Sequence, residues 1–224
     1  MTDEPITSRK RDAARTKATI LRSAVAEFAQ NGPAGTRVDE VAIRAGVNKS
    51  LIYQYFGSKQ ELYADVLTDV LTRAAEKLGA LAEKAAANLQ GGVEAHIENS
   101  LRGHLALLDD IPEYPRIMAW ENLDGGKTLA QPQVRRAFLG MLEKLQLVLK
   151  GLETRGASLK DVDPRHVLLS ALALNHYFVL FKALSQDVLD DWACLPPYIE
   201  FVCGQVFGAP KNVVLLILAC RVTI

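Results

Sequence analysis

Apolar residues recur at three- and four-residue spacing along most of this chain, and this spacing is the repeat of an amphipathic α-helix. Alternating apolar and polar runs, which predict half-buried strands, are missing from the sequence. The composition, with 49% apolar and 23% charged residues, provides enough apolar surface for a packed core and argues against a disordered chain. The sequence therefore predicts an all-α protein.

Local start and stop signals give the bounds of the first two helices. The apolar stripe of the first helix covers residues 13–30, and Gly32 follows as a stop that accepts a positive φ. Thr36, with Asp39 three residues later, forms a variant of the capping box and is expected to begin a second, short helix. Gly46 is expected to end that helix.

Two more caps predict the next helices. Asn48 is expected to cap a third helix that ends at Phe56. Ser58 and Glu61 form a full capping box, in which the serine accepts from the N3 amide and the glutamate accepts from the N-cap amide. The fourth helix that follows is expected to reach about Leu89 and is long enough to join two domains. Later helices are expected at residues 93–108, 114–123, 131–155, 164–184 and 197–207.

The second and third helices, joined by residues 45–47, have the spacing of a helix-turn-helix, in which the second helix enters the major groove of DNA. In the third expected helix, the apolar positions should point inward and the polar positions outward. The donors and acceptors of the polar side chains suit base edges and phosphates. The inward positions are Val47, Ile52 and Phe56, and the outward ones are Lys49, Ser50, Gln54 and Tyr55, with Tyr53 at the edge. A plain helical hairpin with a solvated face is the alternative.

Basic residues are concentrated in the first quarter of the chain, although the net charge of the whole chain is zero. Residues 9–59 contain ten Lys or Arg and four Asp or Glu, whereas residues 60–224 contain 16 and 20. A clustered positive field attracts phosphates, so an anionic partner, either nucleic acid or a membrane surface, is expected at this end. The alternative is that these charges only face solvent.

The segment from Thr36 to Leu62 resembles the DNA-binding segment of the TetR family of bacterial repressors. The resemblance is carried, in order, by Ala42, by Ala45-Gly46-Val47, by Ile52-Tyr53-Gln54-Tyr55-Phe56 and by Ser58-Lys59-Gln60-Glu61-Leu62. It covers about the first 65 residues, and the rest of the chain matches the family only in its all-helical layout.

This resemblance implies particular contacts with DNA. Base or groove contacts are implied for Lys49, Ser50, Leu51 and Gln54, phosphate contacts for Thr36, Tyr53, Tyr55 and Lys59, and a further contact for Arg37. Two positions depart from the family: Ser50 stands where Gly, Ala or Pro is frequent, and Leu51 stands where a smaller residue such as Thr or Ala is usual. Leu51 either touches a thymine methyl group or turns toward the core.

The resemblance also implies a domain organisation and a function. We expect a flexible arm over residues 1–12, a helix-turn-helix DNA-binding domain over 13–62, an effector-binding and dimerisation domain over 63–209, and an apolar tail over 210–224. A long helix is expected to join the two domains. The implied function is that of a ligand-responsive repressor, a homodimer that binds palindromic double-stranded operator DNA and is released by a small-molecule effector. The alternative is an all-helical enzyme or small-molecule carrier with a basic docking end.

Polar and aromatic residues lie in the second domain where an apolar core would be simpler, which is how pockets between helices are built. The candidate effector-binding residues are His104, Tyr114, Met118, Trp120, Glu121, Asn122, Phe138, Asn175, His176 and Phe178. Ordinary core packing is the alternative for each. The two last long helices are apolar on several sides, which predicts a dimer interface. The interface positions expected are Leu168, Leu172, Asn175, Val179, Phe201 and Val202.

Signals for catalysis, cofactors and metals are weak, and none of these is expected. Residues 125–128 (Gly-Gly-Lys-Thr) end like a phosphate-binding loop, but that motif requires glycine where the chain has Glu121, and it requires a preceding strand. The four histidines lack the spacing of metal ligands. Three cysteines without a C-x-x-C pair fit the reducing cytoplasm.

Export and membrane insertion are not expected either. The first 30 residues lack an apolar signal segment, and the longest apolar run, over residues 213–220, is far shorter than the roughly 18 residues that a spanning helix needs. We therefore expect no membrane partner. The apolar tail over 213–224 leaves three alternatives open: a strand or helix packed on the dimer, an interfacial membrane contact, or a non-native extension.

Overall fold

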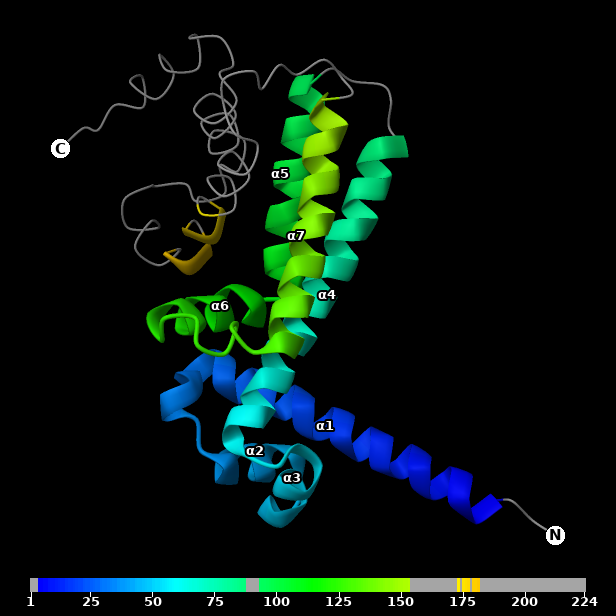
Figure 1. Ribbon diagram of the computed structural model, residues 1–224, viewed down its shortest axis with the longest axis vertical. Coiled ribbons are helices and arrows are strands. Elements are labelled where there is room, and N and C mark those ends of the chain that lie inside the picture. The colour runs from blue at the N-terminus through cyan, green and yellow to red at the C-terminus, as the bar shows by residue number, and fades with distance from the viewer. Residues whose placement is uncertain (1–3, 88–92, 154–172, 174, 178, 182–224) are drawn as a thin grey trace. The chain divides into compact units, whose positions relative to one another are not determined.

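The computed structural model describes residues 4–87, 93–153, 173, 175–177 and 179–181. Within these residues the chain is helical and contains no strand, which confirms the all-α class (Figure 1). The helices are α1 (Glu4–Gly35), α2 (Val38–Ala45), α3 (Lys49–Phe56), α4 (Lys59–Ala87), α5 (Val93–Asp110), α6 (Glu113–Leu123) and α7 (Pro132–Glu153). The helix expected at 197–207, the tail at 210–224 and most of the helix expected at 164–184 lie outside the described residues.

Helix α1 is longer than the sequence predicts at both ends. It begins at Glu4, so residues 4–12, expected to form a flexible arm, are helical, and Pro5 fits because the first turn leaves its N–H without a partner in any case. The expected stop at Gly32 is present. Gly32 has φ 68° and ψ 173°, a backbone conformation open almost only to glycine, and it interrupts the helix before a last turn at Pro33.

Two compact units make up the chain. The first consists of Met1–Arg73 and Pro112–Leu139, and the second consists of Ala74–Ile111 and Gly140–Ile224. The helices α4 and α7 each contribute residues to both units. The first unit therefore contains α6 in addition to the helices of the expected DNA-binding domain.

The first unit has an apolar core that holds α1, α2, α3 and the beginning of α4 together. The rings of Phe28 on α1 and Tyr63 on α4 lie 4.9 Å apart between centroids. The other buried side chains recur at the helical spacing that the sequence shows. They include Ile20, Ala24, Val41, Ala42, Ile52, Phe56, Leu62, Val66 and Leu67. The burial of these side chains packs α2 against α1 and α3 against α2.

In the second unit, the later turns of α4 run beside α5 and beside the later turns of α7 (Figure 1). Their buried residues include Ala74, Leu78, Leu101, Leu105, Leu108, Met141 and Leu145. At the surface Lys77 of α4 forms an ion pair with Asp110 of α5. Among the residues described, no helix combines the length and the apolarity needed to cross a membrane.

Candidate nucleic-acid interface

The turn between α2 and α3 is held by backbone and side-chain caps. Gly46 adopts a left-handed conformation with φ 67°, and its amide donates to the carbonyl of Ile43 while the amide of Val47 donates to that of Ala42. Asn48 Oδ1 accepts from the amide of Ser50 at 3.0 Å and caps α3. The predicted stop at Gly46, the cap at Asn48 and the end of α3 at Phe56 are therefore confirmed.

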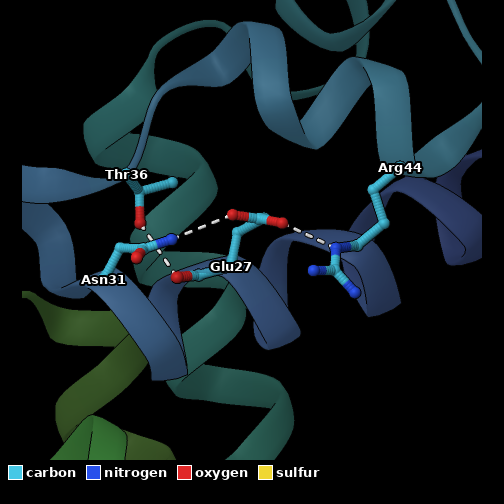
Figure 2. A network of polar contacts seen from close by, with 4 residues as sticks. All are labelled: Glu27, Asn31, Thr36 and Arg44. Carbon is cyan, nitrogen blue, oxygen red and sulfur yellow. Dashed lines mark hydrogen bonds and ion pairs between the residues drawn. The ribbon is translucent and has the colours of Figure 1, made fainter.

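A buried carboxylate fastens α2 to α1. Glu27 of α1 is 7% exposed and accepts from Arg44 Nε of α2 at 2.6 Å and from Asn31 Nδ2 at 3.0 Å (Figure 2). The sequence analysis missed Glu27, but a signal was present. Glu27 lies three residues after Ala24 on the apolar face of α1, where a charged side chain requires partners because it becomes buried. The network orients the helix-turn-helix on α1.

Thr36 does not cap α2, which corrects the sequence analysis. The N-cap residue is Arg37, without a side-chain hydrogen bond, and Thr36 is only 1% exposed. The Thr36 hydroxyl donates to the carbonyls of Gly32 at 2.7 Å and Glu27 at 3.2 Å, and its amide donates to Gly32. The hydroxyl and the amide of Thr36 thus both donate within the protein, so neither is expected to contact a phosphate.

The outer face of α3 presents a row of polar side chains. Lys49, Ser50 and Gln54 are exposed, as the sequence predicts, while Ile52 and Phe56 are buried. The two tyrosines are reversed relative to the prediction, because Tyr53 is 42% exposed and Tyr55 is half-buried. The half-buried group also includes Val47 and Leu51. Tyr55 is more buried than expected because its ring contacts that of Phe56 edge to face, at 6.5 Å between centroids.

Basic side chains flank this outer face at both ends of α3. Lys49 Nζ lies 2.9 Å from Asp39 Oδ1 of α2, and the hydrogen bond to Asp39 raises the pKa of Lys49. Lys59 Nζ, after α3, donates to the carbonyl of Ala34 at 3.3 Å. Arg37, before α2, is exposed. Cations placed in this way can contact phosphates on either side of a groove.

The capping box at the start of α4 is half formed. The amide of Glu61 donates to Ser58 Oγ at 3.1 Å, as predicted. The amide of Ser58 does not bond Glu61 but donates to the carbonyl of Phe56 at 2.9 Å, because the chain turns tightly at Gly57. This tight turn connects the end of α3 at Phe56 to the start of α4 at Lys59.

The expected effector residues fall into two groups. In the second unit, His104 Nδ1 and Asn175 Nδ2 lie 2.8 Å apart, and the rings of His104 and His176 lie 5.6 Å apart. Burial, and then the neighbouring His176, lower the pKa of His104 to about 3. The second unit therefore brings these three polar residues together. Phe178 lies outside the described residues.

The other expected effector residues that the structure describes belong to the first unit. Tyr114 is buried, Met118 and Phe138 are half-buried, and Asn122 is exposed, with Nδ2 donating to the carbonyl of Met118.

Trp120 and Glu121 connect α6 to its surroundings within the first unit. Trp120 Nε1 donates to the carbonyl of Ala29 on α1 at 3.3 Å. Glu121 is fully buried, and its Oε1 accepts from the amides of Thr128 at 2.6 Å and Leu129 at 2.8 Å. These contacts occupy the indole N–H of Trp120 and one carboxylate oxygen of Glu121 within the first unit. They also occupy the amide of Thr128, the last residue of the segment that resembles the end of a phosphate-binding loop.

Most of the expected dimer interface cannot be compared with the structure. Leu168, Leu172, Phe201 and Val202 lie outside the described residues, and Val179 is half-buried. Asn175 is fully buried against His104 of its own chain, so it has no surface to offer a second copy. In the part of the chain that the structure describes, no three His, Cys, Asp or Glu side chains come together as a metal site would require.

In the first unit, α2 and α3 form a helix-turn-helix, and α3 is capped and has an exposed polar face. These features define the class of helix-turn-helix DNA-binding proteins. Residues 20–66 match the family of bacterial regulatory proteins named tetR, and residues 94–194 match a tetracyclin repressor-like C-terminal domain. The chain belongs to the TetR family of bacterial transcriptional regulators.

Individual relatives support this membership. The HTH-type transcriptional repressor SCO4008 of Streptomyces coelicolor is 30% identical over 190 residues, which are 85% of this chain and 84% of the relative. The repressor NicS of Pseudomonas putida is 30% identical over 195 residues, covering 83% and 88% of the two chains. The regulator FadR of Bacillus subtilis, in complex with stearoyl-CoA, matches with a TM-score of 0.58 and 19% identity over 83% of this chain and 97% of FadR.

The family decides between the two functions that the sequence leaves open. Its members are transcriptional regulators, and the relatives are named as repressors or regulators. The protein is therefore a transcriptional regulator and not an enzyme or carrier. TetR-family regulators bind operator DNA and small-molecule ligands.

Proposed function

We propose that this protein is a ligand-responsive repressor that binds a palindromic operator as a homodimer through α3 and is released when a small-molecule effector binds. The observation that carries the proposal is the exposed polar face of α3, fixed by the Asn48 cap and the Glu27 network. A recognition helix reads a base sequence only when its position on the scaffold is rigid, since a misplaced helix loses bidentate geometry.

The proposed contacts are divided by chemistry. Base edges are contacted by Lys49, Ser50, Leu51 and Gln54, and phosphates by Arg37, Tyr53, Tyr55 and Lys59. Gln54 is the strongest candidate for reading a base, because its carboxamide can donate and accept at once and so pair with an adenine edge. The phosphate contacts fix register and carry no sequence information.

A homodimer follows from the geometry of DNA. A palindromic operator presents two half-sites, and two copies of α3 match them when they lie about 34 to 36 Å apart, which is one turn of the double helix. The dimer interface is proposed for the helices expected at 164–184 and 197–207. Binding to chromosomal operators takes place in the cytoplasm of a bacterium, where we expect the protein to act.

The cluster of His104, Asn175 and His176 is proposed as part of the effector site. Buried imidazole and amide groups orient a ligand by hydrogen bonds in a mostly apolar setting. The low pKa of His104 keeps its ring neutral at physiological pH. A neutral ring suits an uncharged ligand that forms hydrogen bonds better than it suits an anionic ligand. Helix α4, which has residues in both compact units, is the proposed route by which ligand binding alters DNA binding.

Selection of bound sequences from a pool of random duplex DNA tests the proposal. We expect an inverted repeat whose half-sites are about one helical turn apart, with an affinity that falls steeply as salt rises. Recovery of no preferred sequence, or an affinity independent of salt, contradicts operator binding through α3. Light scattering that shows a monomer at micromolar concentration contradicts the homodimer.

A further inference from the structure

A carboxylate on α2 holds the first side chain of the recognition helix. Lys49 Nζ lies 2.9 Å from Oδ1 and 3.1 Å from Oδ2 of Asp39, so both carboxylate oxygens face the ammonium group. The two side chains are 44% and 49% exposed, so the pair lies on the surface and adds little to stability.

Asp39 is in an unfavourable place for a protein that binds a polyanion. It lies in the first turn of α2, next to the start of α3, and an unpaired carboxylate there would repel phosphates. The neighbouring Glu40 belongs to the same first turn, is exposed, and makes no ion pair with any described residue. Asp39 thus differs from Glu40 in its contact with Lys49 and in being the less exposed of the two residues.

We propose that Asp39 is a specificity-determining residue that pins the Lys49 ammonium at the start of α3 and withholds it from the DNA backbone. A lysine on a flexible stem reaches any phosphate within its range, and that contact strengthens binding to every sequence equally. A lysine held by Asp39 keeps its ammonium group in one position. There it can donate a hydrogen bond to a base acceptor such as guanine O6 or N7, which is present only in the correct sequence. Asp39 therefore lowers non-specific affinity more than operator affinity.

The inference rests on the proposed DNA contact of α3 and adds Asp39, which makes no base contact of its own. The charge of the pair supports it. Lys49 paired with Asp39 presents a smaller net field to distant phosphates than a free ammonium does, so fewer counterions are released when random DNA binds.

The test compares Asp39→Asn with Glu40→Gln, which makes the same change of net charge one residue away. Binding of each variant to a random-sequence duplex is measured over a fourfold range of salt. Asp39→Asn is expected to steepen the slope of log affinity against log salt by about 0.9 relative to Glu40→Gln, the value of one added phosphate contact, or about 3.5-fold in affinity over that range. In a Lys49→Met background this difference is expected to vanish.

Selection from random duplexes provides the second readout. Asp39→Asn is expected to recover a motif with weaker preference at the base position that Lys49 faces, whereas Asp39→Glu, which keeps the carboxylate, restores the preference. Equal slopes and equal motifs for Asp39→Asn and Glu40→Gln would overturn the inference. If the unmodified protein itself recovers no inverted repeat, it is the proposed function that fails, so the two failures are distinguishable.

Discussion

Replacing Glu121 by alanine is expected to loosen the turn after α6 and to lower the free energy of unfolding. Glu121 is fully buried, and its Oε1 is the acceptor for the amides of Thr128 at 2.6 Å and Leu129 at 2.8 Å. Hydrogen bonds to charged groups contribute about 1.5 to 3 kcal/mol each, so the loss of both is expected to cost about 3 to 6 kcal/mol.

Glu121→Gln is the matched control for this prediction. Its amide oxygen can accept from the same two amides, and its side chain fills the same volume without a buried charge. We expect Glu121→Gln to cost no more than about 2 kcal/mol, since both amides keep an acceptor.

Urea unfolding measures the two free energies, and hydrogen exchange at the amides of Thr128 and Leu129 reports the turn itself. Glu121→Ala is expected to lose protection at both amides, whereas Glu121→Gln keeps it. Equal destabilisation by alanine and glutamine, or full protection of both amides in Glu121→Ala, would refute the reasoning, because Oε1 would then not be what holds the turn.

Three further predictions follow from single residues. Gly32→Ala is expected to cost about 2 to 6 kcal/mol, because it combines a glycine-only backbone with overpacking, and an added Cβ would lie 2.7 Å from Trp120 Cδ2. Gly46→Ala, which meets nothing within 4 Å, is expected to cost only about 1 to 2 kcal/mol in urea unfolding. The pKa of His104, lowered to about 3, predicts that stability falls as the pH drops below about 6.5, by about 2 kcal/mol at pH 5, because only the unfolded chain takes up the proton there. Unfolding curves of His104→Gln between pH 7 and pH 5 should lack this fall, and an identical pH dependence in both proteins would contradict it.

Local signals made the recognition helix predictable from the sequence. The cap at Asn48, the stop at Gly46 and the inward spacing of Ile52 and Phe56 involve residues within a few positions of one another. Such signals act through the backbone of one short segment, so distant parts of the chain have little opportunity to override them.

Contacts between distant segments were not predictable in the same way. Thr36 fits the capping pattern, but its hydroxyl donates to the carbonyl of Gly32, the residue at which α1 is interrupted. Trp120 and Glu121 suit a pocket wall by composition, yet their partners are Ala29 and the turn after α6. An aromatic or acidic residue at helical spacing indicates that the position is buried or polar. The group that the side chain contacts depends on how the helices pack.

The central claim is that the exposed face of α3 reads bases through Gln54, and selection of random duplexes with the protein and with Gln54→Ala tests it most directly. The unmodified protein is expected to recover an inverted repeat, and Gln54→Ala the same repeat with one base position in each half-site relaxed, at a cost of about 1 to 3 kcal/mol against the original sequence. Lys59→Ala is the comparison, since loss of a phosphate contact should weaken all duplexes alike. A uniform loss of affinity for Gln54→Ala, with the recovered motif unchanged, would contradict the account.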